Sequence, residues 1–271
     1  MPPTLAIEPN DRVTFKVRHE DADFLVIDKP AGLVTQPGLG HEHDTLLNGL
    51  FAQYGALLQN LGKDRDYGLL HRLDRETSGL LLVGLRPRAY DALREAFAGR
   101  TIRKHYWAVT DRAPREASGV IKKPLAEVQA KGRGSRSGKD RFTPSVKLAR
   151  ISSSGKPAVT AYRVLSSSDV ASLIECRPLT GRLHQVRVHL DSIGCPILGD
   201  EFYGPSAVRD AAPRLALHAH RLVFEHPAKP GETIDVQSPW PRDLRSLLTR
   251  LKLPRPDMDT PSGGEPPARG E

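Results

Sequence analysis

One stretch of this chain constrains its fold and function more than any other: a charged turn that leads directly into an apolar strand. Residues 71–83 read HRLDRETSGLLLV. Asp74 stands between Arg72 and Arg75, and nearby positive charge favours the ionised form of a carboxyl group. The Thr-Ser-Gly turn lets the backbone reverse before the apolar run enters a sheet. This combination is typical of a functional site, although by itself it also fits a solvated ion pair at the start of a strand.

The hydrophobic pattern predicts many short strands and a few amphipathic helices. We expect strands over residues 14–18, 24–27, 104–110, 119–122, 146–151, 159–165, 172–179, 215–225 and 233–237. We expect helices from an N-cap at Asp44 to Leu61, over 87–99, within 180–194 from Arg182 onward, and over 243–252. The short spacing and β-branched content of the strands favour a mainly antiparallel sheet. The predicted class is therefore α+β.

The charged turn resembles the signature of the RluA-type pseudouridine synthases, and further segments match the same family in the same order. These segments are FLVIDKPAG (24–32), KHYWAV (104–109), GRLHQVRVHL (181–190), LGDEFYG (198–204) and LHAHRL (217–222). The resemblance covers residues 13 to 240 approximately. It implies a pseudouridine synthase fold, in which a central sheet in two halves is flanked by helices and the active-site cleft lies between the halves.

The domain organisation follows from the extent of this resemblance and from composition. We expect an N-terminal extension over 1–12, one catalytic domain over 13–253 and a disordered tail over 254–271. The tail is rich in Pro, Gly and charge, with almost no large apolar side chain, which is typical of a segment that does not fold.

The resemblance also implies the site residues. Asp74 is the expected catalytic carboxylate, which either attacks the sugar or removes a sugar proton; the sequence leaves both routes open. Tyr106 is expected to stack on the uracil and to assist deprotonation at ring carbon five. Arg182 is expected to pair with the catalytic aspartate. The expected substrate-binding residues are Arg72, which has a counterpart implicated in base flipping, together with His71, Arg75, Thr77, Gln185 and Arg187.

Charge points to a polyanionic partner. The net charge is +8 and the isoelectric point is about 9.6, which favours nucleic acid without identifying it. The segment 131–141 carries five basic residues and one acidic residue on a Gly/Ser backbone. It is either an RNA clamp or a solvated linker inside a hairpin. Its glycine spacing does not fit a phosphate-binding P-loop. We expect the RNA partner to be a ribosomal or transfer RNA stem-loop.

Other classes of protein receive little support from the sequence. The two cysteines, Cys176 and Cys195, show no metal-ligand spacing. Five histidines invite a metal-dependent hydrolase, but we interpret them as structural or RNA-contacting: His184, His189, His218, His220 and His226. We therefore expect no metal and no cofactor. No apolar run is long enough to span a bilayer, so we expect a cytoplasmic protein. We also expect a monomer. A catalytically silent RNA-binding protein that kept the fold is the alternative.

Overall fold

Residues 5–131 and 145–256 of a computed structural model of the chain are described. They form two compact units. Unit 1 contains described residues 5–107, 216–249 and 255–256, and unit 2 contains 108–131, 145–215 and 250–254. Among the described residues, no helix combines the length and hydropathy that crossing a lipid bilayer requires.

Unit 1 is built on neighbouring strands in the order β1-β2-β3-β10-β4, with β11 paired to β10. Its elements are β1 (Lys16–Glu20), β2 (Phe24–Lys29), α1 (Leu46–Leu61), the 3-10 helix η1 (Lys63–Gly68), β3 (Ser78–Gly84), α2 (Pro87–Ala98), the start of β4 (Arg103–Thr110), β10 (Leu217–Glu225), β11 (Thr233–Gln237) and α5 (Arg242–Arg250). The β1–β2, β2–β3 and β10–β11 pairs are antiparallel, whereas β3 and β10 are parallel. The strand that follows the charged turn is therefore an interior strand.

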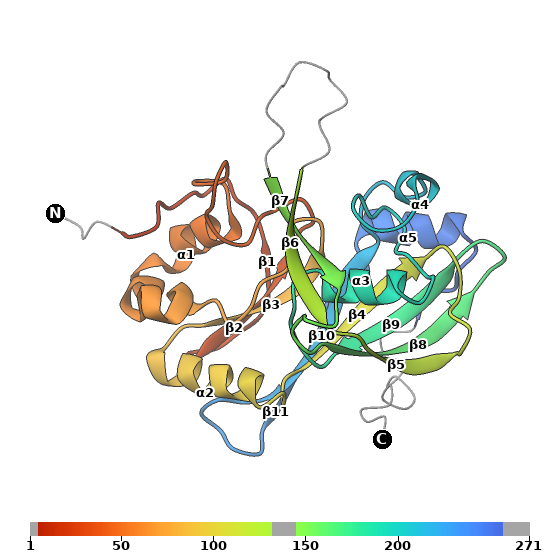
Figure 1. Cartoon of the computed structure of the whole chain (residues 1–271). Helices are drawn as coiled ribbons and strands as arrows, with labels where there is room; N and C mark the ends of the chain where they lie inside the picture. Colours follow the sequence, from red (N-terminus) through yellow and green to blue (C-terminus); the bar gives the residue numbers. More distant parts are fainter. Residues whose placement is uncertain (1–4, 132–144, 257–271) are drawn as a thin grey trace. The chain divides into compact units, whose positions relative to one another are not determined.

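Strands β2 and β3 are buried on both faces, and a different helix covers each face (Figure 1). Leu25 and Ile27 of β2 belong to the core that α1 completes. Phe24 and Val26, which alternate with them, belong to the core that contains Leu93 of α2. Because successive strand residues face opposite sides, this explains why β2 and β3 are continuous apolar runs without a polar alternation.

Helix α1 begins one residue later than the sequence predicts. Its N-cap is Thr45 and not Asp44, which is exposed. The amide oxygen of Asn48 accepts hydrogen bonds from the backbone N–H and the hydroxyl of Thr45 at 3.0 and 2.6 Å, so a capping box defines this end of the helix. Asn48 also donates to the carbonyl of Glu8, and this contact ties the predicted N-terminal extension to α1.

Unit 2 contains the end of β4 and two antiparallel groups of strands. The first group has the order β9-β8-β5, formed by β5 (Ser118–Lys122), β8 (Val159–Ser167) and β9 (Ser172–Pro178). The second pairs β6 (Leu125–Lys131) with β7 (Ser145–Ile151), and two helices follow, α3 (Gln185–Asp191) and α4 (Ser206–Asp210). Strand β6, η1 and α4 were not predicted. Most of the basic segment 131–141 lies outside the described residues.

The helix expected from Arg182 onward is shorter than predicted, since α3 begins only at Gln185. His184 at its N-cap has a left-handed backbone, with φ of 50°, and the helix cannot extend through this conformation. Arg182 thus precedes the helix and is exposed, instead of beginning the helix as predicted. The predicted fold class is confirmed: both units combine helices with mainly antiparallel strands.

Candidate functional site

The loop that carries Asp74 is held through its backbone on both sides of that residue. On the N-terminal side, the buried hydroxyl of Thr35 donates to the carbonyl of Leu73 at 2.9 Å. On the C-terminal side, the carbonyl of Arg75 accepts the backbone N–H of Gly32 at 2.8 Å. The N–H of Thr77 donates to the carbonyl of Asp74 at 3.1 Å and closes the turn. The backbone position of Asp74 is therefore set by the hydrogen bonds to Leu73 and Arg75, the residues on either side of it.

Lys29 at the end of β2 reinforces this arrangement. Its side chain is fully buried, and its ammonium donates to the carbonyls of Pro30, Leu33 and Arg75 at 2.9, 2.8 and 3.1 Å. A buried ammonium needs such acceptors because its desolvation is costly. Lys29 thus joins the turn after β2 to the Asp74 loop. Neither Lys29 nor Thr35 was predicted, although the KPAG turn itself was part of the family resemblance.

The backbone conformation and surroundings of Gly79 explain why the charged turn contains a glycine. Its φ is +118°, and a Cβ atom there would lie 2.2 Å from the carbonyl oxygen of Ala219. Only glycine therefore allows β3 to approach β10 this closely. The neighbouring Ser78 hydroxyl lies 2.9 Å from Nδ1 of His218, and residues Leu80–Val83 are completely buried. The turn that presents Asp74 is thus anchored to an interior strand.

Tyr106 lies in unit 1 with Asp74. It is half-buried and packs against the core formed by α1, β2 and β3. Burial raises the pKa of Tyr106, and the negative charge of Asp74 raises it further. The phenol is therefore neutral at physiological pH. Trp107, the next residue of β4, faces the other way, as side chains alternate along a strand. It stacks on His220 and Trp240 with centroid distances of 3.7 and 4.3 Å.

The other unit 1 residues of the predicted site divide into exposed and engaged groups. Arg72 and Arg75 are exposed, and Arg75 lies 3.6 Å from Glu76. His71 is half-buried, and its Nε2 accepts the backbone N–H of Leu82 at 3.1 Å. Burial and the charge of Lys104 lower the pKa of His71 to about 3. His71 therefore supports β3 as a neutral ring.

Thr77 is buried, and within the described residues its hydroxyl has no hydrogen-bond partner.

The unit 2 residues of the predicted site are mostly engaged by the protein itself. Gln185 is buried; it accepts the Thr180 hydroxyl and donates to the carbonyl of Val159. Arg187 is buried and forms a bidentate ion pair with Asp200, in which both N–O distances are 2.7 Å. These contacts give both residues a structural role. Arg182 is exposed and donates to the carbonyl of Pro157 at 3.3 Å. Its pairing with Asp74 stays a prediction.

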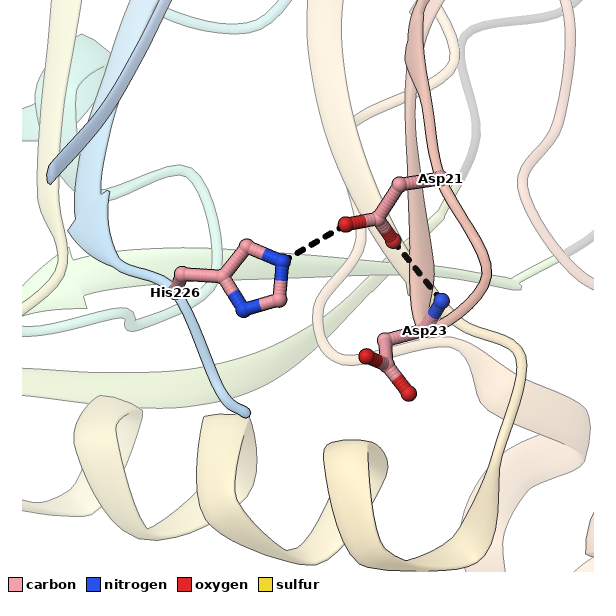
Figure 2. Close-up of side chains that lie close together, drawn as sticks. All are labelled: Asp21, Asp23 and His226. Carbon is pink, nitrogen blue, oxygen red and sulfur yellow. Dashed lines mark hydrogen bonds and ion pairs between the residues drawn. The ribbon is translucent and has the colours of Figure 1, made fainter. Parts of the chain in front are cut away.

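One cluster among the described residues has the composition of a metal site: Asp21, Asp23 and His226, whose ligand atoms lie within 4.8 Å of one another (Figure 2). His226 is buried, and its Nε2 lies 2.6 Å from the Asp21 carboxylate. Its Nδ1 accepts the backbone N–H of Ala228 at 3.0 Å. A nitrogen that accepts this bond carries no proton, so Nε2 carries it and donates to Asp21. In this form, Nε2 offers no lone pair to a metal.

The same contacts set the charge of Asp21. Partial burial acts to raise the pKa of Asp21, but hydrogen bonds from the Asp23 N–H, His226 and the Phe24 N–H outweigh it and lower the pKa. Asp21 is therefore an ionised acceptor that joins the turn between β1 and β2 to the end of β10. The cluster fits a hydrogen-bonded clamp better than a ligand set.

Comparison with known proteins agrees with this structure. The family model for RNA pseudouridylate synthase matches residues 23–192. A ribosomal large subunit pseudouridine synthase D of Zymomonas mobilis is 38% identical over 91% of this chain and 75% of that protein. An uncharacterized RNA pseudouridine synthase of Bacillus subtilis is 37% identical over 90% of this chain and 74% of that protein. The solved structure of human RNA pseudouridylate synthase domain containing 4 has a TM-score of 0.66 and 30% identity, covering 89% of this chain and 94% of that one.

The fold and the matched region together define an RNA-modifying isomerase. The match includes the Asp74 turn, the Tyr106 strand and Arg182. The chain belongs to the RNA pseudouridylate synthase family, and its enzymatic class is that of the pseudouridine synthases.

Proposed function

We propose that this enzyme converts a uridine of large-subunit ribosomal RNA to pseudouridine, with Asp74 as the catalytic carboxylate. One observation carries the assignment of Asp74: its backbone is fixed from both sides by Thr35, Gly32 and Lys29, while its charge acts on Tyr106. A backbone fixed on both sides of Asp74 supports this role, since catalysis depends on groups positioned before the substrate arrives.

The reaction breaks the bond between the sugar and uracil nitrogen, turns the base and rejoins it through carbon five. Asp74 would attack the sugar or remove a sugar proton. Tyr106 would act as a neutral phenol, because its pKa is raised; it would stack on the base and assist transfer of the proton from carbon five. A base in a folded RNA must leave its stack to reach these groups. Exposed Arg72 would either fill the space that the base leaves or contact a phosphate.

The RNA class is inferred from relatives. Several similar proteins are named for the ribosomal large subunit, including those of Zymomonas mobilis and Nitrosomonas europaea, the latter 36% identical over 93% of this chain and 70% of that protein. Transfer RNA is the second candidate. Pseudouridine mapping in total RNA from cells with and without the gene separates the two: loss of a large-subunit ribosomal position is expected, and loss of a transfer RNA position would contradict the ribosomal assignment.

Asp74→Asn tests the catalytic role. Asn is nearly the same size but is a much weaker nucleophile or base, so turnover should fall at least about a thousandfold. RNA affinity should stay within about tenfold. The measurement is tritium release from RNA labelled at uracil carbon five, beside a binding titration and a melting curve. The exposed carboxylate of Asp64 gives the control, Asp64→Asn, which should keep full activity.

Each outcome has a distinct meaning. Full activity in folded Asp74→Asn would remove Asp74 from the chemistry. RNA binding without turnover in the wild-type protein, measured on total RNA from cells that lack the gene, would favour the silent RNA-binding alternative.

A further inference from the structure

Lys104 stands on β4 in surroundings that do not satisfy its charge. Its ammonium lies 5.6 Å from the centre of the Phe97 ring, and the side chain is half-buried. Within residues 5–131 and 145–256, the ammonium has no hydrogen-bond acceptor and no carboxylate partner. The neighbouring His71 is neutral and offers no negative charge. An aromatic face attracts a cation only weakly, so the charge is poorly compensated.

Lys29 provides an internal contrast. That lysine is more deeply buried, but three carbonyl groups accept its protons. Lys104 has no comparable set, and burial lowers its pKa to about 8. The ammonium therefore still predominates at neutral pH. A half-buried cation that lacks an acceptor destabilises the folded protein. The presence of such a residue is explained if a ligand supplies the missing anion.

The position of Lys104 identifies that ligand. Lys104 and Tyr106 are two residues apart on one strand, so their side chains leave the same face of β4, with Cα atoms roughly 7 Å apart. Tyr106 in turn lies within the electrostatic reach of Asp74. An anion at Lys104 would thus lie beside the reacting nucleotide, and phosphodiester groups are the anions that RNA brings to such a place.

We propose that Lys104 binds a phosphate group of the substrate RNA, at or next to the nucleotide whose base lies against Tyr106. The inference rests on the proposed function, since it takes Tyr106 to contact the target base. Lys104 is then a substrate-binding residue that the enzyme retains at a cost in stability. Its charge contributes to affinity and not to the bond-breaking step.

Three variants test this. Lys104→Met removes the charge but keeps an unbranched apolar side chain, and Lys104→Arg keeps the charge. Lys63→Met is the matched control, because Lys63 is an exposed lysine of η1 in the same unit. The substrate is total RNA from cells that lack the gene, labelled with tritium at uracil carbon five. This RNA contains the unmodified target whichever class it belongs to.

For Lys104→Met we expect KM to rise about tenfold to a hundredfold, the loss typical of one hydrogen bond to a charged group, with kcat within about threefold of wild type. The salt dependence of log(kcat/KM) should flatten by about 0.7 to 0.9, the contribution of one phosphate contact. The melting temperature should stay the same or rise. Lys104→Arg should recover most of the affinity, and Lys63→Met should match wild type.

Several results would overturn the proposal. An unchanged KM and salt slope would show that Lys104 does not meet phosphate. A fall in kcat at unchanged KM would place Lys104 in the chemistry of the base. A lower melting temperature with an unchanged salt slope would make Lys104 a structural residue. The same substitution in an Asp74→Asn background, followed by RNA binding alone, keeps this test independent of the role of Asp74: the loss of affinity should be the same whether or not Asp74 is catalytic.

Discussion

Thr35 donates its hydroxyl hydrogen to the carbonyl of Leu73 at 2.9 Å, across 38 residues of chain. Leu73 is the residue before Asp74, and the residue after it, Arg75, has its carbonyl bound by Gly32 and Lys29. The proposed catalytic carboxylate is thus positioned through main-chain contacts. Thr35 is accordingly a positioning residue, which acts on the reaction through the loop and not by touching the substrate.

Replacing Thr35 by Val should remove this bond while keeping the shape of the side chain. The buried carbonyl of Leu73 would lose its hydrogen-bond donor, so unfolding should become easier by about 1 to 2 kcal/mol. Turnover should fall because Asp74 loses one of its restraints, whereas KM should change little. Kinetics by tritium release and a denaturant titration measure the two effects.

Thr35→Ser is the matched variant, since it keeps the hydroxyl and removes a methyl group. It should lose stability through the small cavity, by about 1 kcal/mol, but keep kcat near the wild-type value. If Val and Ser variants lose the same fraction of kcat, the hydrogen bond to Leu73 does not position the loop.

The sequence was sufficient to predict the strands around this loop but not the contacts that fix it. Apolar runs with short turns predicted β2, β3 and most of unit 2, because burial and backbone geometry act over a few residues. The bond from Lys29 to Arg75 joins positions 46 residues apart, and no local pattern distinguishes a lysine that turns inward from one that faces water. The same limit applies to Gln185 and Arg187, which were expected to contact RNA and are buried with internal partners.

Gly79→Ala should be strongly destabilising. The added Cβ would lie 2.2 Å from the carbonyl oxygen of Ala219, on a backbone with φ of +118°. Both the close contact and the backbone strain then act on the start of β3, and we expect a loss of more than about 3 kcal/mol. Gly38→Ala is the control, because nothing lies within 4 Å of a Cβ there and its φ is not positive. A melting curve for each variant decides, and equal stability would contradict the close approach of β3 and β10.

Tyr106→Phe should fold normally and bind RNA with wild-type affinity, because the ring and its packing are retained. The phenol has a raised pKa and is neutral, so its hydroxyl can assist proton transfer without first losing its own proton to solvent. Product formation should slow by about tenfold to a thousandfold, in the range of a lost general acid–base group. Unchanged turnover would make Tyr106 a packing residue that only stacks on the base.

The stability of the protein should depend on pH through Lys104 in a defined window. The pKa of this lysine is about 8 in the folded protein, against 10.5 for an ordinary lysine. Between these values the unfolded chain binds more protons than the folded one, so stability rises with pH. The titratable groups beside Lys104 do not change their protonation in the folded protein over this pH range, since His71 has a pKa of about 3 and the pKa of Tyr106 is raised.

The measurement is the free energy of unfolding at pH 7.5 and pH 9.5, for wild type and Lys104→Met. Other groups titrate in both proteins, so the difference between them isolates Lys104. Lys104→Met should be the more stable protein at pH 7.5, and its advantage should shrink by about 1 to 2 kcal/mol at pH 9.5, where wild-type Lys104 has lost its proton. Saturating RNA should reverse the order at pH 7.5, because a bound phosphate stabilises the ammonium form. A constant difference across this range would show that Lys104 titrates normally and that its charge is not strained in the free enzyme.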